Sequence, residues 1–200
     1  MDRSAVTAVP LHPLLAGRWS PRAFDGSRAL TRADLLPLLE AARWAPSSGN
    51  TQPTRWLVTL RGEPAYERLY DTLSRGNRSW AGRAPALLLA VSLQSDDSGR
   101  PYPSAAHDTG QAVAHLSVQA AAQGLAVHQM AGFDAAAVRS AFGLTDVQQP
   151  AVVVAVGVPG GPPLEGRLAE KEAAPRVRKP LEELLLPAGP GDDHAAGTAA

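Results

Sequence analysis

The sequence contains no cysteine among its 200 residues. A disulfide framework, a thiolate nucleophile, a cysteine-ligated zinc site and an iron–sulfur cluster are therefore excluded. Redox chemistry in this chain has to use a bound cofactor, because the side chains offer no thiol to carry electrons.

The sequence also lacks an excess of charge of either sign and a long hydrophobic run. Nineteen Lys and Arg residues balance nineteen Asp and Glu residues, so the strong field that supports non-specific binding to nucleic acid or anionic membranes is missing. Apolar runs such as residues 84–93 fall far short of the roughly 20 residues that span a bilayer. We expect a cytoplasmic protein that binds neither nucleic acid nor membrane, and any anion site must be a local cluster.

The length fits one globular domain, which we expect to span residues 1–186. Residues 187–200 have nothing to bury and are expected to form a disordered tail. Between these limits, strand-like and helix-like segments mix without strict alternation. This mixture favours an α+β fold, in which a sheet is surrounded by helices.

Local signals place the expected elements. Thr31 and Asp34 have the N-cap spacing of a helix over residues 32–44, and Pro37 is expected to kink that helix or delay its start. Small apolar residues surround most of a second helix at 104–123, which predicts packing on several sides. The other expected helices are 63–74, one from Asp134 to Gly143, and a short helix or extension at 181–186; the expected strands are 56–60, 86–91, one ending within 128–134, and 151–156.

Two basic clusters lie near the ends of the chain. Arg18, Ser20 and Arg22 stand at alternate positions, and alternate side chains of an extended segment share a face, so they can converge on one phosphate. The alternative is a pair of solvated arginines beside a turn. A solvated face is also the commoner use of the second run, which consists of Arg176, Arg178 and Lys179.

Two loops offer hydrogen-bonding groups. Residues 45–53 present hydroxyl and amide groups on a backbone held by prolines, a suitable rim for a planar heterocycle. An ordinary helix-to-strand connection is equally consistent, since such residues dominate turns. Residues 128–134 contain the small residues Ala131 and Gly132, which let a ligand approach the backbone and use its N–H groups.

In this order and spacing, the four clusters resemble the FMN-dependent nitroreductase family over residues 14–185. The most specific parts are the pattern Arg18-x-Ser20-x-Arg22-x-Phe24 and the segment 42–53. The resemblance implies a nitroreductase-like α+β fold with a central, mainly antiparallel sheet surrounded by helices. It also implies a homodimer with FMN at the interface, in a groove to which both chains contribute.

The resemblance implies a role for each cluster. Arg18, Ser20 and Arg178 would hold the FMN phosphate, and Arg176 or Lys179 would add to them. Arg22 would lie at the N1/O2 side of the flavin, and the 45–53 loop would contact its pyrimidine edge. A backbone N–H at Ala131 or Gly132 would donate to flavin N5, so no side chain is assigned as catalytic. The full implied cofactor-binding set is Arg18, Trp19, Ser20, Arg22, Pro46, Ser47, Ser48, Asn50, Gln52, Gln129, Met130, Ala131, Gly132, Arg176, Arg178 and Lys179.

The implied function is that of an FMN-dependent NAD(P)H oxidoreductase. NADH or NADPH would deliver hydride to flavin N5 and leave, and a nitroaromatic, quinone or similar small molecule would then take the electrons, which predicts ping-pong kinetics. Two departures concern the substrate face: Thr54 and Arg55 stand where many relatives carry an aromatic residue, and the segment 94–103 is short. The short segment, together with the lack of a recognisable nicotinamide-binding fingerprint, keeps an alternative open, a flavin-binding or flavin-handling protein with little NAD(P)H turnover.

Other functions fit the sequence less well. Ser47 and Ser48 lie in no Gly-x-Ser-x-Gly elbow, so a hydrolase is disfavoured. His107 and His115 point about 80° apart on a helix with no carboxylate at ligand spacing, so we expect no metal site. His128 is expected to be a structural histidine. The four tryptophans, at positions 19, 44, 56 and 80, are expected to be core or interface anchors.

Overall fold

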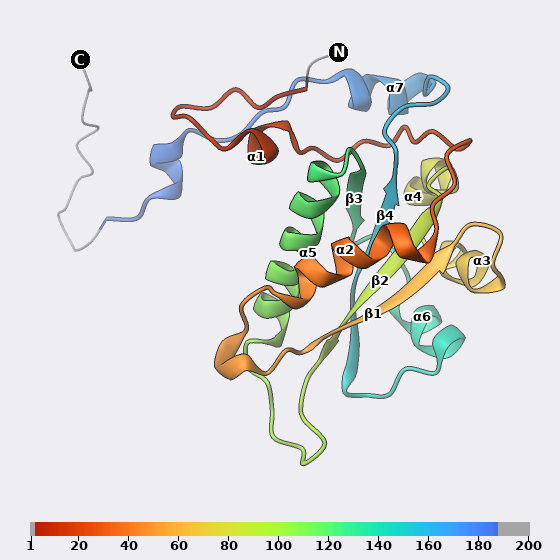
Figure 1. Ribbon diagram of the computed structural model, residues 1–200, viewed down its shortest axis with the longest axis vertical. Coiled ribbons are helices and arrows are strands. Elements are labelled where there is room, and N and C mark those ends of the chain that lie inside the picture. Colours follow the sequence, from red (N-terminus) through yellow and green to blue (C-terminus); the bar gives the residue numbers. More distant parts are fainter. Residues whose placement is uncertain (1–2, 188–200) are drawn as a thin grey trace.

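The computed structural model describes residues 3–187 (Figure 1). Within them, four strands form one sheet in the order β1–β2–β4–β3, and every neighbouring pair is antiparallel. The expected α+β fold with a mainly antiparallel sheet is thereby confirmed. The expected tail lies outside the described residues, apart from Pro187. The strands are β1 (Thr54–Leu60), β2 (Ala86–Leu93), β3 (Ala126–Met130) and β4 (Gln148–Gly157).

Helices cover both faces of the sheet (Figure 1). In β2, residues 86, 88 and 90 pack with α2 and α5, whereas residues 87, 89 and 91 pack with α3, α4 and α6. Burial on both faces explains why this strand is a continuous apolar run. The helices are α1 (Pro13–Gly17), α2 (Arg32–Arg43), α3 (Pro64–Asp71), α4 (Arg75–Ala81), α5 (Ala105–Ala122), α6 (Ala135–Phe142) and α7 (Gly166–Ala173), with 3-10 turns η1 (Ser48–Asn50) and η2 (Leu181–Leu184).

Helix α2 begins where its capping residues predict. Thr31 accepts from the backbone N–H of Asp34, whose side chain accepts in return from the backbone of Thr31. The expected delay at Pro37 is wrong, because the helix begins at Arg32 and runs through Pro37 without interruption. Leu35 and Leu38, on either side of the proline, are fully buried, and this burial outweighs the one backbone hydrogen bond that proline removes.

The structure corrects one further expectation and confirms another. The helix expected at 63–74 ends at Asp71, and the chain bends so that Leu73 pairs with Phe133 before α4 begins at Arg75. The expected packing of helix α5 on several sides is confirmed, because its buried residues pack against both α2 and the sheet. Its sheet-facing side is buried, but Ala106, Gly110 and Ala114, spaced four residues apart, lie on an exposed face.

Candidate functional site

Three of the four clusters singled out in the sequence, at residues 18–22, 128–134 and 176–179, meet beside the edge strand β3. The segment at residues 18–22 runs along this strand, where the His128 Nδ1 atom donates to the Pro21 carbonyl oxygen at 2.9 Å. The C-terminal basic run joins the same segment, because Arg176 donates to the carbonyl oxygens of Ala16 and Arg18 at 2.8 and 2.9 Å. Folding thus brings together residues that are more than 150 positions apart in the sequence.

Arg18, Arg176 and Arg178 form a concentrated positive charge. The pKa of Arg18 is lowered by burial and then by the charges of Arg176 and Arg178. In the described part of the chain, no carboxylate forms an ion pair with any of these three arginines. Repulsion of this kind is relieved by a bound anion, and a phosphate with several oxygens suits guanidinium donors.

The basic cluster opens into a groove of about 510 Å³ that Arg18, Arg176, Arg178 and Lys179 line together. The Arg18 Nη1 atom lies 3.4 Å from the Ser20 hydroxyl oxygen, in agreement with their expected convergence. Arg22 does not line this groove. Its guanidinium lies 3.9 Å from the Glu172 carboxylate, so it does not join Arg18 and Ser20 at one anion. Arg176 is committed to backbone carbonyl oxygens of distant segments, and Lys179 pairs with Glu183 at 3.1 Å. Within residues 3–187, Arg178 donates only to the carbonyl oxygen of the adjacent Val177, so Arg18 and Arg178 keep N–H groups for an anion.

The loop after β3 exposes Ala131 and Gly132. The Gly132 carbonyl oxygen accepts from the Ser74 backbone N–H and from the Asn77 side-chain amide, both at 2.9 Å. A Cβ at position 132 would lie 2.9 Å from the Ser74 hydroxyl oxygen and 3.0 Å from the Asn77 amide nitrogen, so an alanine here would have to displace these two side chains. Met130 as a whole residue is only 2% exposed and belongs to the core, in contrast to the exposed Ala131 and Gly132.

The 45–53 loop lies elsewhere, at the first turn of α5. The Ser48 backbone N–H donates to an Asp108 carboxylate oxygen at 3.0 Å, and Pro46, Ser47 and Gln52 line a cavity of about 380 Å³. Asn50 and Gln52 adopt positive φ angles of 56° and 46°. Such backbone strain in residues other than glycine is concentrated at ligand-binding sites.

Sequence reasoning missed several residues of this region. Asn77, Ser74 and Glu172 carry no local signal, because the fold alone brings them to Gly132 and Arg22. Asp108 is an acidic residue in the first turn of a helix, which is too common a feature to single it out.

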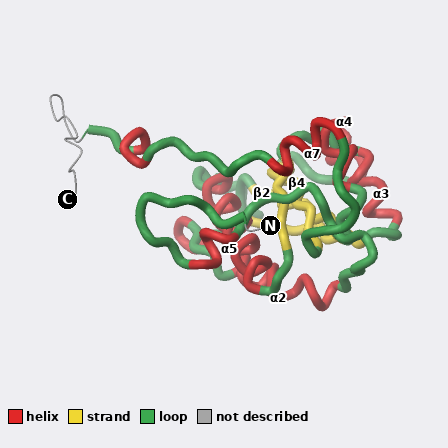
Figure 2. Tube along the Cα trace, turned by 90° about the horizontal axis from the view of Figure 1, so that it is seen from above, coloured by secondary structure: helices red, strands yellow, loops and turns green. Residues whose placement is uncertain are grey.

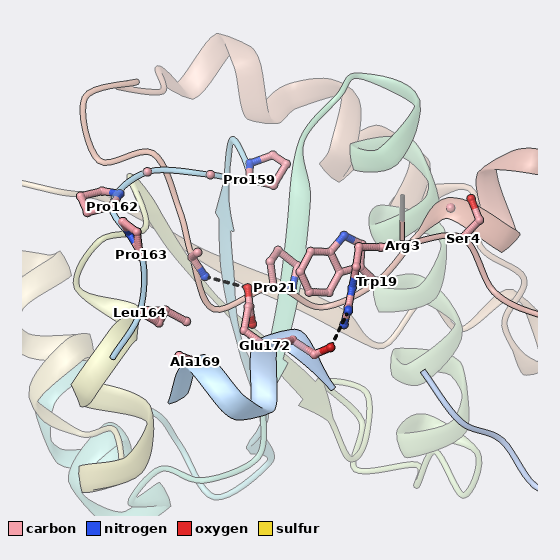
Figure 3. Close-up of a pocket in the computed structure, with 15 residues that line it drawn as sticks. Arg3, Ser4, Trp19, Pro21, Pro159, Pro162, Pro163, Leu164, Ala169 and Glu172 are labelled. Carbon is pink, nitrogen blue, oxygen red and sulfur yellow. Dashed lines mark hydrogen bonds between the residues drawn. The ribbon is translucent and has the colours of Figure 1, made fainter. Parts of the chain in front are cut away.

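Trp19 lies between two surface cavities. It lines a small cavity of about 270 Å³ with Arg18 and the C-terminal end of α5, and a larger one of about 640 Å³ against α7 (Figure 3). The Arg3 guanidinium stacks over its ring at 4.8 Å. Of the other tryptophans, Trp80 is buried as expected, whereas Trp44 is 72% exposed and does not belong to the core of the chain.

His128 packs against the core rather than pointing into solvent. Its ring lies 4.4 Å from the Trp80 ring, and burial lowers its pKa, against the opposing effect of its hydrogen bond to Pro21. The histidines considered as metal ligands, His107 and His115, are both exposed on α5. Among residues 3–187, no helix is long and apolar enough to cross a membrane.

The lowered pKa of His128 makes stability depend on pH. The native state keeps the ring neutral at pH values where the unfolded chain, with a pKa near 6.5, binds a proton. The stability that the neutral, buried His128 ring contributes is fully present above about pH 6.5, and it is lost as the pH falls toward the native pKa. We therefore expect His128→Asn to lose less stability than the wild type between pH 7.5 and pH 5, measured by thermal unfolding.

The matched control for this prediction is His107→Gln, because His107 is exposed. This variant should keep the pH dependence of the wild type. An equal pH dependence in His128→Asn and the wild type would contradict the assignment of a neutral, buried His128.

Comparisons with known proteins identify the family. The model of the nitroreductase family matches residues 15–76 and 60–158. The chain therefore belongs to the nitroreductase family, as its sequence motifs suggested.

Individual relatives agree with this placement. The chain is 37% identical over 141 residues to an uncharacterized 15.4 kDa protein of Mycolicibacterium smegmatis, covering 66% of this chain and 94% of that protein. It is 31% identical over 157 residues to a putative NADH dehydrogenase/NAD(P)H nitroreductase of Streptomyces coelicolor, covering 68% and 77% of the two chains. A crystal structure described as an oxidoreductase containing FMN superimposes with a TM-score of 0.87 at 30% identity, over 94% of this chain and 97% of the other.

Proposed function

We propose that this chain is an FMN-dependent NAD(P)H oxidoreductase that reduces a nitroaromatic, quinone or similar small molecule. The observation that carries the proposal is the meeting of Arg18, Ser20 and Arg178 beside the strand that leads to the exposed Ala131 and Gly132. The name of the Streptomyces coelicolor relative supports the activity, and the FMN-containing neighbour supports the cofactor.

The residues present fit FMN. The arginine cluster, which has no carboxylate partner among the described residues, suits a phosphate dianion, and the exposed backbone at Ala131 and Gly132 is accessible to a flat ring. When bound, the flavin supplies hydride acceptance from NADH or NADPH and electron delivery to the acceptor, in a ping-pong sequence.

The chain itself binds and orients the cofactor. Arg18, Ser20 and Arg178 anchor the phosphate end, and a backbone N–H at Ala131 or Gly132 donates to flavin N5. The guanidinium of Arg22 lies at the N1/O2 side and favours negative charge there. Because these groups keep fixed charges, no side chain has to gain or lose a proton at N5.

The proposed site is shared between two copies of the chain. The 45–53 loop lies at Asp108 and Arg18 lies near Ala121, so about 20 Å of α5 separates them in one chain. In a homodimer, the loop of one copy approaches the basic cluster of the other. Asn50 and Gln52 then hydrogen-bond the pyrimidine edge, and Pro46, Ser47 and Ser48 line the site.

Exposed apolar surface supports the homodimer. The segment between α7 and η2 runs away from the sheet (Figure 2). Val177 on this segment is 73% exposed, and Leu181 and Leu184 of η2 are 52% and 64% exposed. Exposed apolar groups of this kind mark interfaces. Light scattering at micromolar concentration tests the dimer, and a monomer that retains FMN would contradict the shared site.

Anaerobic mixing tests the activity. We expect NADH or NADPH to lower the absorbance of the bound flavin at about 450 nm, because this absorption belongs to the oxidised cofactor. A protein that binds FMN but is bleached by neither nicotinamide would instead be a flavin-handling protein, which the short connection at residues 94–104 between β2 and α5 favours.

Gly132→Ala is expected to slow flavin reduction about tenfold. The new Cβ would lie 2.9 Å from the Ser74 hydroxyl oxygen and 3.0 Å from the Asn77 amide nitrogen, so these side chains must move and the hydrogen bond from Asn77 that holds the Gly132 carbonyl oxygen is lost. A misplacement of about 1 Å at a reacting centre can lower the rate about 100-fold, and the partial loosening of this loop is expected to cost about tenfold. Stopped-flow reduction measures the rate.

Gly76→Ala serves as the matched control, because Gly76 lies on the neighbouring helix α4 and a Cβ there meets nothing within 4 Å. It should reduce at the wild-type rate. Wild-type kinetics in Gly132→Ala would show that this loop does not position the flavin.

A further inference from the structure

Glu172 of α7 binds the backbone of the N-terminal segment. Its two carboxylate oxygens accept from the Arg22 N–H at 2.9 and 3.1 Å, and one of them also accepts from the Ala23 N–H at 3.1 Å. Figure 3 shows this side chain reaching from α7 to the segment, between Pro21 and Ala169. A carboxylate that accepts several backbone N–H groups holds that backbone in one place, because charge-assisted hydrogen bonds are the stronger ones.

Glu172 also faces the guanidinium of Arg22. The Glu172 carboxylate oxygen lies 3.9 Å from Arg22 Nη1, and the two side chains are only 17% and 26% exposed. Partial burial strengthens the interaction, since less water screens the two charges. Arg22 thus carries a positive charge that a fixed negative charge opposes at close range.

We propose that Glu172 is a positioning residue that fixes Arg22 beside the flavin and lowers the reduction potential of the cofactor by offsetting the Arg22 charge. The proposal rests on the proposed function, which places Arg22 at the N1/O2 side of FMN. Reduction adds negative charge to that side of the flavin, so a nearby carboxylate disfavours the reduced form. Without the Glu172 carboxylate beside it, the Arg22 guanidinium would favour the reduced flavin more strongly.

Two substitutions separate the charge of Glu172 from its hydrogen bonds. Glu172→Gln removes the charge, while its single carbonyl oxygen can take the position of the carboxylate oxygen that accepts from both Arg22 N and Ala23 N. Glu172→Ala removes the charge and all three of these hydrogen bonds. Glu170→Gln is the matched control, because Glu170 lies on the exposed face of the same helix.

The midpoint potential of bound FMN, measured by anaerobic reductive titration, tests the charge. We expect Glu172→Gln to shift the equilibrium about tenfold toward reduced flavin, which corresponds to a rise of about 30 mV for a two-electron couple. Glu170→Gln should keep the wild-type potential. An unchanged or lowered potential in Glu172→Gln, or a loss of FMN from this variant alone, would overturn the proposal.

The dissociation constant of FMN tests the positioning. Glu172→Ala should bind FMN about tenfold more weakly than Glu172→Gln, because only the alanine releases the backbone at Arg22 and Ala23. Equal affinities would overturn the positioning role. Failure of the wild-type protein to bind FMN would sink the proposed function itself, an outcome distinct from a wild-type protein that binds FMN at a potential insensitive to Glu172.

Discussion

Replacing Arg18 and Arg178 together with alanine is expected to weaken FMN binding about 100-fold or more. Each guanidinium would contribute a hydrogen bond to a charged phosphate, worth about 1.5–3 kcal/mol. Two such bonds amount to about 3–6 kcal/mol, and each 1.4 kcal/mol is tenfold in affinity. Fluorescence titration of the apoprotein with FMN measures the loss.

The choice of these two arginines follows from their partners. Arg176 is left unchanged because it ties the carbonyl oxygens of Ala16 and Arg18, and its removal would disturb the segment itself. The matched control removes two exposed arginines, Arg28 and Arg100, and should bind FMN like the wild type. Unchanged affinity in the Arg18 and Arg178 double variant would show that the phosphate is held elsewhere.

Trp80→Ala is expected to lower the free energy of unfolding by about 3–5 kcal/mol. The Trp80 side chain is 2% exposed and packs against Phe24 and His128, with ring centroids 6.3 and 4.4 Å away. Its removal leaves a cavity in the core cluster to which Trp80 belongs, because close-packed side chains relax only in part. The corresponding fall in Tm is about 6–20 °C for a chain of this length.

This stability prediction is measured on the apoprotein, because a ligand that binds only the folded state would mask the change. Trp80→Phe is the matched variant. It retains an aromatic ring at the site and should recover at least half of the lost stability. A Trp80→Ala protein as stable as the wild type would mean that this part of the core is not packed as described.

Local chemistry predicted much of the fold. The apolar run at residues 86–91 and the strand at 151–156 are both in the sheet, and Gly143, with a φ of 62°, ends the helix that Asp134 caps. These features depend on residues close together in the sequence, so periodicity and capping are enough to detect them. The split of the 63–74 segment was missed, because the pairing of Leu73 with Phe133 is a contact between distant residues.

The features of the candidate site likewise fall into those that the sequence predicted and those that only the fold revealed. The sequence by itself determined the family, through the motif at residues 18–24 and the segment 42–53, together with the need for a cofactor in a chain without cysteine. Only the tertiary structure decided that Met130 turns into the core, that Asn77 clamps Gly132, and that Glu172 rather than an anion site holds Arg22. The physical reason is that backbone preferences and hydrophobic periodicity act over a few residues, whereas charge pairing and backbone clamps join segments that meet only when the sheet and its helices have packed.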